Sequence, residues 1–205
     1  MKKTFFLVLG FLAYLNSGAI YATSSNAPQF RGGDIIFQTS KSSQSKAIQL
    51  ATHSKWSHVG VIVYREGKPY VYEASGPVGY RTLSAWTSSG VNGKYMVRRY
   101  KTDLTSAQVL KLKSVGQTFA SKPYDLYFGW TDSRIYCSEL VWKIYYRALG
   151  VSVGSLQELG DFDLSHPEVQ RILRERYGNN IPYEETVVSP EAIAVSPNLK
   201  TIFQN

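Results

Sequence analysis

Runs of β-branched and aromatic residues predict the strands of this chain. Two such runs flank the loop REGK within residues 56–74, an arrangement typical of a β-hairpin. A glycine turn followed by a short apolar run predicts a strand within residues 31–40, and residues 93–100 predict another. The hairpin is the clearest of these elements.

Helical spacing of apolar residues predicts most of the remaining elements. The predicted helices are 42–54, 105–121 opened by Thr105, a segment from about Cys137 closed by Gly150, and 163–178 capped by Ser165. Residues 122–134 predict a loop, and residues 187–197 a short terminal strand or helix. The order strand, helix, hairpin, strand, helix, helix indicates an α+β domain with an antiparallel sheet.

The amino-terminal segment has the layout of a secretory signal peptide. Lys2 and Lys3 precede an apolar run over residues 5–15, and small residues follow, with cleavage expected near Ala19 or Ala22. A membrane anchor is the alternative, but the uninterrupted run is shorter than a spanning helix needs. We therefore expect residues 1–22 to be a leader, residues 23–205 to form a single domain, and the protein to be periplasmic.

The charge suggests an anionic surface or substrate. The full chain has a net charge of +8, and removing Lys2 and Lys3 with the leader leaves 21 basic and 15 acidic residues. Cell-wall polymer or membrane headgroups suit an exported basic protein. The basic residues are dispersed without a nucleic-acid-binding motif, so no nucleic-acid partner is expected. Three histidines and one cysteine show no metal-ligand spacing, so neither a metal nor another cofactor is expected.

The single cysteine, Cys137, has two interpretations. It lies on the apolar stripe of its predicted helix, and free cysteine is commonly a buried packing residue. It also lies at the start of that helix, where backbone N–H groups and the helix dipole favour a thiolate, which is the nucleophilic form. Glu139 in the first turn partly opposes this effect, and its expected role is to stabilise the helix dipole.

A base and an orienting carboxylate lie in the hairpin. If REGK is its loop, opposing positions place Glu73 opposite Gly60, so Glu73 is the diagonal, same-face neighbour of His58. A carboxylate in the otherwise apolar strand YVYEA needs a partner, and orienting an imidazole is one such role. The alternatives are a hydrogen-bonded edge histidine and a solvated edge glutamate. His53 and His166 are expected to be surface residues.

Five segments together resemble the permuted papain-fold group and, within it, the YiiX-like family of exported bacterial proteins. The segments are GDIIFQ (33–38), SHVGVIV (57–63), VYEA (71–74), KPYD (122–125) and YCSELVW (136–142). This group is related to NlpC-type cell-wall peptidases and lecithin-retinol acyltransferases. The resemblance implies a circularly permuted papain-like fold, with an antiparallel sheet packed against a central cysteine-bearing helix.

The resemblance also implies a triad with Cys137 as nucleophile, His58 as base and Glu73 as the orienting residue. Some relatives have histidine or asparagine in place of this glutamate. Tyr124 and Asp125 match the PYD element, and Tyr124, Tyr136 and Asp125 are candidate substrate-binding residues. The expected function is an exported cysteine amidase or endopeptidase acting on cell-wall peptide or amino-acid amides.

Two other functions remain open. One is a lipid acyl hydrolase or acyltransferase, although no amphipathic membrane-binding stripe is visible. The other is a non-catalytic domain that binds wall fragments or amino acids.

Overall fold

A six-stranded antiparallel sheet forms the centre of the fold in the computed structural model, which describes residues 29–205. The strand order is β4-β3-β2-β1-β5-β8. The bounds are β1 (Ile35–Gln38), β2 (His58–Arg65), β3 (Lys68–Glu73), β4 (Gly79–Thr82), β5 (Tyr95–Tyr100) and β8 (Leu199–Gln204). A separate two-stranded ladder joins β6 (Gln157–Glu158) and β7 (Thr186–Val187). The predicted leader, residues 1–22, lies outside the described residues.

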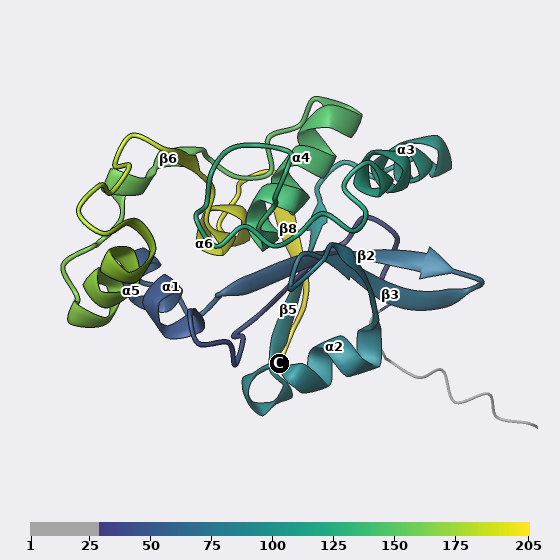
Figure 1. Cartoon of the computed structure of the whole chain (residues 1–205). Coiled ribbons are helices and arrows are strands. Elements are labelled where there is room, and N and C mark those ends of the chain that lie inside the picture. The colour runs from purple at the N-terminus through teal and green to yellow at the C-terminus, as the bar shows by residue number, and fades with distance from the viewer. Residues whose placement is uncertain (1–28) are drawn as a thin grey trace, which may run out of the picture.

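Helices cover both faces of the sheet (Figure 1). The helices are α1 (Ser45–Thr52), α2 (Leu83–Ser89), α3 (Ser106–Gln117), α4 (Cys137–Leu149), α5 (Pro167–Tyr177) and α6 (Pro190–Ala194), with short 3₁₀ turns at Val91–Gly93 and Leu159–Asp161. Helices α3 and α4 lie on one face and α2 on the other, while α1 and α5 pack together to one side. No helix within residues 29–205 has the length and apolar character needed to cross a membrane.

The β2–β3 hairpin has the register expected from the sequence. Val61 pairs with Tyr72 and Arg65 with Lys68, so Glu66 and Gly67 alone form the turn. Both residues have positive φ, 50° and 73°, which suits a two-residue hairpin turn whose twist matches that of the strands. The four-residue loop of the prediction is therefore a two-residue turn, and the pairing is unchanged.

The alternation of side chains along the strands builds two cores. Val59, Val61 and Tyr72 point toward α4, where Leu140 and Ile144 belong to the same buried cluster. On the opposite face, Trp86 of α2 is fully buried against four aliphatic side chains. Those side chains are Ile36, Ile62, Val71 and Val97.

Helix α4 is the central element of the larger core. It begins at Cys137 and ends at Gly150, whose φ of 69° provides the left-handed terminus that glycine favours. Its residues are buried on almost every side, and only Tyr146 and Arg147 within the helix are exposed. The sequence predicted both ends of this helix and its apolar stripe correctly.

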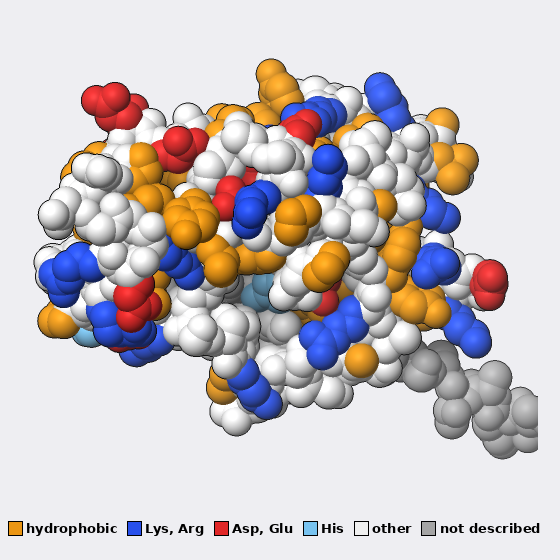
Figure 2. Space-filling view, viewed as in Figure 1, with side chains coloured by type: hydrophobic (Ala, Val, Ile, Leu, Met, Phe, Trp, Pro, Cys, Tyr) orange, Lys and Arg blue, Asp and Glu red, His pale blue; other side chains and the backbone are white. Residues whose placement is uncertain are grey.

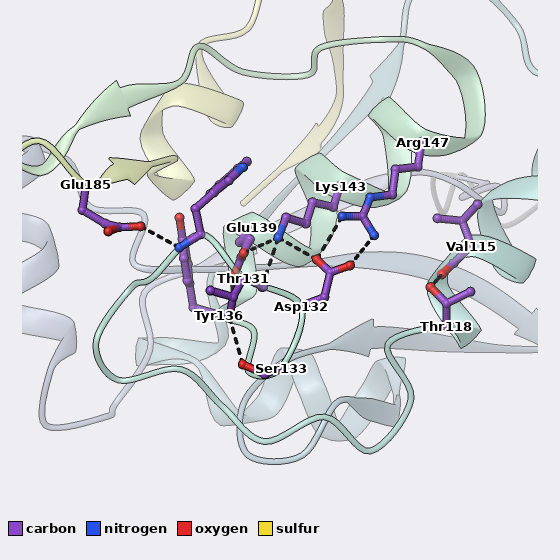
Figure 3. A network of polar contacts seen from close by, with 11 residues as sticks. Val115, Thr118, Thr131, Asp132, Ser133, Tyr136, Glu139, Lys143, Arg147 and Glu185 are labelled. Carbon is purple, nitrogen blue, oxygen red and sulfur yellow. Dashed lines mark hydrogen bonds and ion pairs between the residues drawn. The ribbon is translucent and has the colours of Figure 1, made fainter.

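The polar side chains of α4 join an ionic network that extends from the buried Glu139 and Lys143 to the exposed Arg147 and Asp132 (Figure 3). Lys143 Nζ lies 2.7 Å from Glu139 and 2.9 Å from Asp132, and Arg147 also binds Asp132. Glu139 in turn accepts the backbone N–H of Tyr136 at 3.2 Å. The network thereby ties the start of α4 to the preceding loop, and the helix-dipole role expected for Glu139 stays a prediction.

Several sequence-based expectations need correction or addition. Helix α5 is capped by His166, whose Nδ1 accepts the Glu168 N–H, and not by Ser165; Ser165 instead donates to Asp163. The segment 187–197 holds the end of β7 followed by α6. Strands β4 and β8 and helix α2 were not predicted, because short amphipathic segments give little periodic signal.

Candidate active site

The only cysteine of the chain lies at the amino-terminal end of α4, 3% exposed. Burial would raise its pKa, but the interaction with His58 and hydrogen bonds from the backbone of Val59 and Ser138 lower the pKa of Cys137 overall. The Ser138 N–H in the first turn of α4 contributes to this shift, but the interaction with His58 contributes more. The packing interpretation also holds, because Cys137 belongs to the larger core.

His58 and Glu73 form a buried hydrogen-bonded pair beside this thiol. His58 Nε2 lies 2.5 Å from Glu73 Oε2, and Glu73 is 4% exposed. The predicted diagonal contact is thus confirmed, and Glu73 is not a solvated edge residue. Because Nε2 is held by the carboxylate, Nδ1 is the nitrogen left to interact with Cys137.

The geometry of this pair follows from the hairpin. His58 begins β2 and Glu73 ends β3, and the register puts both on the face that carries α2. Gly60 lies between them without a side chain, and a Cβ there would lie 2.4 Å from the Val71 side chain and 3.4 Å from Glu73 Cβ. Glycine at this position therefore permits the close approach of the two strands.

Trp86 of α2 completes the carboxylate environment. Its Nε1 donates to Glu73 Oε2 at 2.7 Å, and its ring stacks on His58 with centroids 5.8 Å apart. The sequence analysis did not identify Trp86. The available signal was a lone large aromatic residue inside the small-residue segment TLSAWTSSG, which is weak evidence for any particular role.

The electrostatics favour a thiolate–imidazolium pair. Burial would lower the pKa of His58, but hydrogen bonds and charge interactions with Cys137 and Glu73 outweigh it and raise the pKa to about 10. Burial likewise opposes the charge on Glu73, and interactions with His58, Trp86 and Ser75 lower its pKa overall. The thiol pKa falls while the imidazole pKa rises, as expected when a proton moves from one to the other.

Tyr124 places its hydroxyl next to Cys137. Tyr124 forms an isolated parallel β-bridge with Ile135, which brings the start of the loop beside α4. Gln44 donates to the Tyr124 hydroxyl at 2.8 Å and accepts from Arg176 at 2.7 Å. Burial and the neighbouring thiolate raise the pKa of Tyr124, so its hydroxyl remains a hydrogen-bond donor. Sequence reasoning missed Gln44 and Arg176, which lie in polar segments without a distinctive pattern.

The other two candidate substrate-binding residues have different positions. The Tyr136 ring lies within the core against Phe128, and its hydroxyl accepts the Val188 N–H at 3.1 Å. It lines the apolar cavity described below. Asp125 is buried under its own loop, where it accepts the Tyr127 N–H at 2.8 Å. Its position supports a role in holding the loop that carries Tyr124.

Two spaces lie beside the Cys137–His58 pair, and each is lined by one of the two residues. A groove of about 470 Å³ is lined by His58, and Tyr124 borders it. An apolar cavity of about 100 Å³ is lined by Cys137 and Tyr136, and Tyr124 borders it too. Figure 2 shows a hollow in the middle of one face, with a histidine at its floor and basic and hydrophobic side chains around it.

Relatives of known sequence and structure match most of the chain. The uncharacterized protein YiiX of Escherichia coli K12 is 56% identical over 170 residues, which cover 83% of this chain and 84% of that protein. A crystal structure described as metalloprotein yiiX from Escherichia coli O157:H7 superposes with a TM-score of 0.84 at 55% identity, covering 85% of this chain and 97% of the other.

The described residues do not fit the metal site that the word metalloprotein in that description implies. Within residues 29–205, no three or more His, Cys, Asp or Glu side chains are grouped so that they could hold an ion. At the Cys137–His58–Glu73 arrangement, Glu73 Oε2 already accepts from both His58 and Trp86. We therefore derive no chemical step through a metal.

The family assignment agrees with the fold and with the arrangement at Cys137. The sheet, the central cysteine helix and the order of histidine strand before cysteine helix are those expected of a permuted papain-like fold. The model of the family described as permuted papain-like amidase enzyme, YaeF/YiiX, C92 family matches residues 29–203. This chain therefore belongs to the YaeF/YiiX family of permuted papain-like amidases.

Proposed function

We propose that this protein is an exported cysteine amidase in which Cys137, His58 and Glu73 act as nucleophile, base and orienting carboxylate. The observation that carries the proposal is the buried His58–Glu73 hydrogen bond beside a thiol at a helix start. Peptides of the cell wall and related amino-acid amides are the proposed substrates, because an exported basic protein is attracted to an anionic wall. The proposed location is the periplasm.

The geometry supports acyl transfer through a thioester. The Cys137 thiolate attacks the amide carbonyl carbon, and the backbone N–H groups at the start of α4 stabilise the oxyanion. The His58 imidazolium then gives its proton to the leaving amine, and the C–N bond breaks. Water, activated by neutral His58, attacks the thioester and releases the acid and the free thiol. Glu73 keeps Nε2 bonded and stabilises the imidazolium throughout.

Thiol alkylation at controlled pH tests the ion pair directly. Iodoacetamide is expected to label Cys137 well below pH 8 in wild-type protein, because the thiol pKa is lowered from 9.0. The substitution His58→Ala should remove this acid-side reactivity and lower any amide turnover by at least about 10³-fold. Labelling would be followed by intact mass, with folding checked by circular dichroism.

A second histidine provides the matched control. His53 is exposed and has a positive φ of 50°, which asparagine tolerates, so His53→Asn should leave labelling unchanged. Turnover should rise with pH as Cys137 ionises and fall as His58 loses its proton near pH 10. A thiol that reacts only in denatured protein would contradict the proposal and favour a non-catalytic binding domain.

One observation favours the alternative function, that of a lipid acyl hydrolase. The space beside Cys137 is apolar, as an ester-linked or amide-linked acyl chain requires. Incubation of the folded, thiol-reactive protein with phospholipid vesicles and, separately, with short wall peptides distinguishes the two substrates by the product released.

A further inference from the structure

The turn end of the β2–β3 hairpin projects from the sheet, on the side opposite α1 and α5 (Figure 1). Strand β1 pairs with β2 only through Val61, whereas β3 pairs with it as far as Arg65. His58 and Arg65 are the two ends of β2, roughly 23 Å apart at ~3.3 Å per residue. The projecting end is therefore separate from the active-site groove that His58 lines.

Two cations lie directly opposite each other on this projection. Arg65 pairs with Lys68 across the strands, and both side chains are exposed. Like charges placed directly opposite in a sheet are destabilising. Within residues 29–205, neither Arg65 nor Lys68 has a carboxylate within ion-pair distance. An anion bound between the two would relieve this repulsion.

Tyrosine rings hold the Arg65 side chain in place. Its guanidinium lies 4.4 Å from the centre of the Tyr80 ring and 5.6 Å from that of Tyr70. The Tyr80 ring is itself packed against Tyr72, with centroids 4.7 Å apart. A guanidinium fixed by its flat face keeps its N–H groups available, and these groups match the oxygens of a phosphate.

An apolar surface adjoins these cations. A groove of about 190 Å³ between the hairpin and α3 is lined by Tyr64, Tyr80, Leu110 and Lys113, and none of its described lining residues is Asp or Glu. Tyr64 is 40% exposed and Leu110 is 65% exposed. Figure 2 shows basic side chains around hydrophobic surface at this end of the molecule. We call residues 64–70, together with Tyr80, Leu110 and Lys113, the hairpin end.

The hydrogen bonds of the tyrosines favour a lipid surface over a sugar polymer. Three of the hydroxyl groups are already bonded within the protein: Tyr64 to the Phe30 carbonyl, Tyr72 to the Gly116 carbonyl and Tyr80 to the Gln117 amide. A sugar has many hydroxyl groups that need hydrogen-bond partners, whereas the hairpin end offers mainly rings, a leucine and cations. Tyrosine is enriched at the membrane–water interface, and Lys and Arg bind anionic headgroups there.

We propose that the hairpin end is a docking surface for a membrane that contains anionic phospholipid. Arg65, Lys68 and Lys113 bind phosphate groups, while Tyr64 and Leu110 lie at the boundary between the headgroups and the acyl chains. A strand ribbon and a helix build this surface together, so no single segment of the sequence has a membrane-binding stripe. The inference goes beyond the proposed amidase function and does not depend on it.

Sedimentation with lipid vesicles at neutral pH tests the proposal. Wild-type protein should bind vesicles of phosphatidylcholine mixed with phosphatidylglycerol at least about tenfold more tightly than vesicles of phosphatidylcholine alone, because only the former attract the three cations. Added salt should weaken this binding, since it screens exposed charges. Equal binding to both kinds of vesicle, or no binding to the anionic ones, would overturn the proposal.

Two double variants with the same change in net charge locate the surface. Arg65→Gln with Lys68→Gln should weaken binding to the anionic vesicles about 10- to 30-fold, at about fivefold for each cation. Arg171→Gln with Arg174→Gln removes two charges from α5, on the other side of the molecule, and should change binding by less than about twofold. Equal weakening by both would mean that net charge alone attracts the protein, which contradicts a docking surface.

A matched pair of apolar residues tests the contact with the acyl boundary. Leu110→Ser should weaken binding to the anionic vesicles about three- to fivefold, because the serine buries less apolar surface. Val195→Ser, at a position 64% exposed just after α6, should leave binding unchanged. Unchanged binding in Leu110→Ser would contradict the placement of this side chain in the interface.

The wall polymer is the competing partner. Binding to isolated wall sacculi without any binding to anionic vesicles, lost in Arg65→Gln with Lys68→Gln, would assign the hairpin end to the wall and overturn the membrane proposal. Iodoacetamide labelling of Cys137 should be the same in all these variants as in wild type, which shows that the fold and the active site are intact. Wild-type protein that binds vesicles without labelling retains the docking surface and loses the amidase, and the reverse result retains only the amidase.

Discussion

Two buried carboxylates, Glu73 beside His58 and Glu139 in the first turn of α4, have opposite electrostatic settings. Glu73 accepts from His58 and Trp86, and these interactions hold its pKa below the ordinary value of 4.5. Glu139 is fully buried, and burial outweighs its ion pair with Lys143 and raises its pKa to about 7. A nearby opposite charge alone therefore does not fix the ionisation of a buried acid.

The two pKa shifts differ in sign because the polar contacts that replace the hydration removed by burial are more numerous at Glu73 than at Glu139. Glu73 is opposed by an imidazolium, an indole N–H and a guanidinium 4.0 Å away. Glu139 contacts the ammonium group of Lys143, and Asp132 and a backbone carbonyl bind the same ammonium. Desolvation is costly for any buried ion, so a carboxylate stays charged only where several donors compensate. The site beside His58 supplies them.

The largest expected effect, on turnover, comes from comparing the variants Glu73→Gln and Glu139→Gln. Glu73→Gln should reduce turnover by about 10²- to 10⁴-fold, because a neutral amide cannot stabilise the imidazolium. Glu139→Gln should keep turnover within about threefold, since it acts on the helix start and not on the proton transfers. Steady-state rates on an identified amide, together with alkylation rates below pH 8, measure both. Equal losses in the two variants would remove the functional distinction between the carboxylates.

The pH dependence of stability should have opposite signs at the two sites. Glu139 has a raised pKa, so its contribution to folding is complete below pH 4.5 and is lost as the pH rises to about 7. The lowered pKa of Glu73 gives a contribution that is present above pH 4.5 and lost below it, as the pH falls through the folded-state value. Urea unfolding of Glu139→Gln should thus lack a decline of up to about 3 kcal/mol between these limits.

Glu73→Gln is the control for that measurement, because it should keep the decline toward neutral pH and lose only the acid-side change. If Glu139→Gln unfolds with the same pH profile as wild type, Glu139 is ionised throughout and the contrast between the two sites is wrong.

The smallest effect concerns the second donor to Glu73. Trp86→Phe removes the indole N–H and keeps most of the ring, so turnover should fall about three- to tenfold. Trp142→Phe also removes a buried indole hydrogen bond, here to Gly154, but far from the carboxylate. Trp142→Phe should lower the free energy of unfolding by about as much as Trp86→Phe and leave turnover unchanged. If turnover falls equally in both variants, the effect of Trp86→Phe comes from lost stability and not from the hydrogen bond to Glu73.

The contact between His58 and Glu73 could be predicted because its geometry is local. A two-residue turn fixes the β2–β3 register, so the separation of His58 and Glu73 in the chain determines their contact. The start of α4 at Cys137 was equally readable from helical periodicity and the terminal glycine. The catalytic roles and the leader remain predictions.

The surroundings of the pair could not be predicted, because tertiary packing brings them together. Trp86 reaches Glu73 from helix α2, which packs on the face of the sheet that carries Glu73, and Arg176 reaches Gln44 from 132 positions along the chain. Strand β8 pairs with β5 across about half the sequence. Side chains that meet through such long-range contacts carry no local spacing signal.

The absence of a side chain at Gly60 has a consequence for how this sequence can vary. A Cβ there would lie 2.4 Å from a Val71 methyl group, 3.0 Å from the Tyr72 carbonyl and 3.4 Å from Glu73 Cβ, so even alanine must displace the Val71 side chain and crowd the strand that carries Glu73. In a saturation library selected for amide turnover, position 60 should be as restricted as positions 58 and 73, and Gly60→Ala should be depleted with them. Recovery of many residues at position 60 would contradict this expectation. If position 60 is as restricted as expected, a residue without any functional group is as constrained as the residues proposed to perform the chemistry.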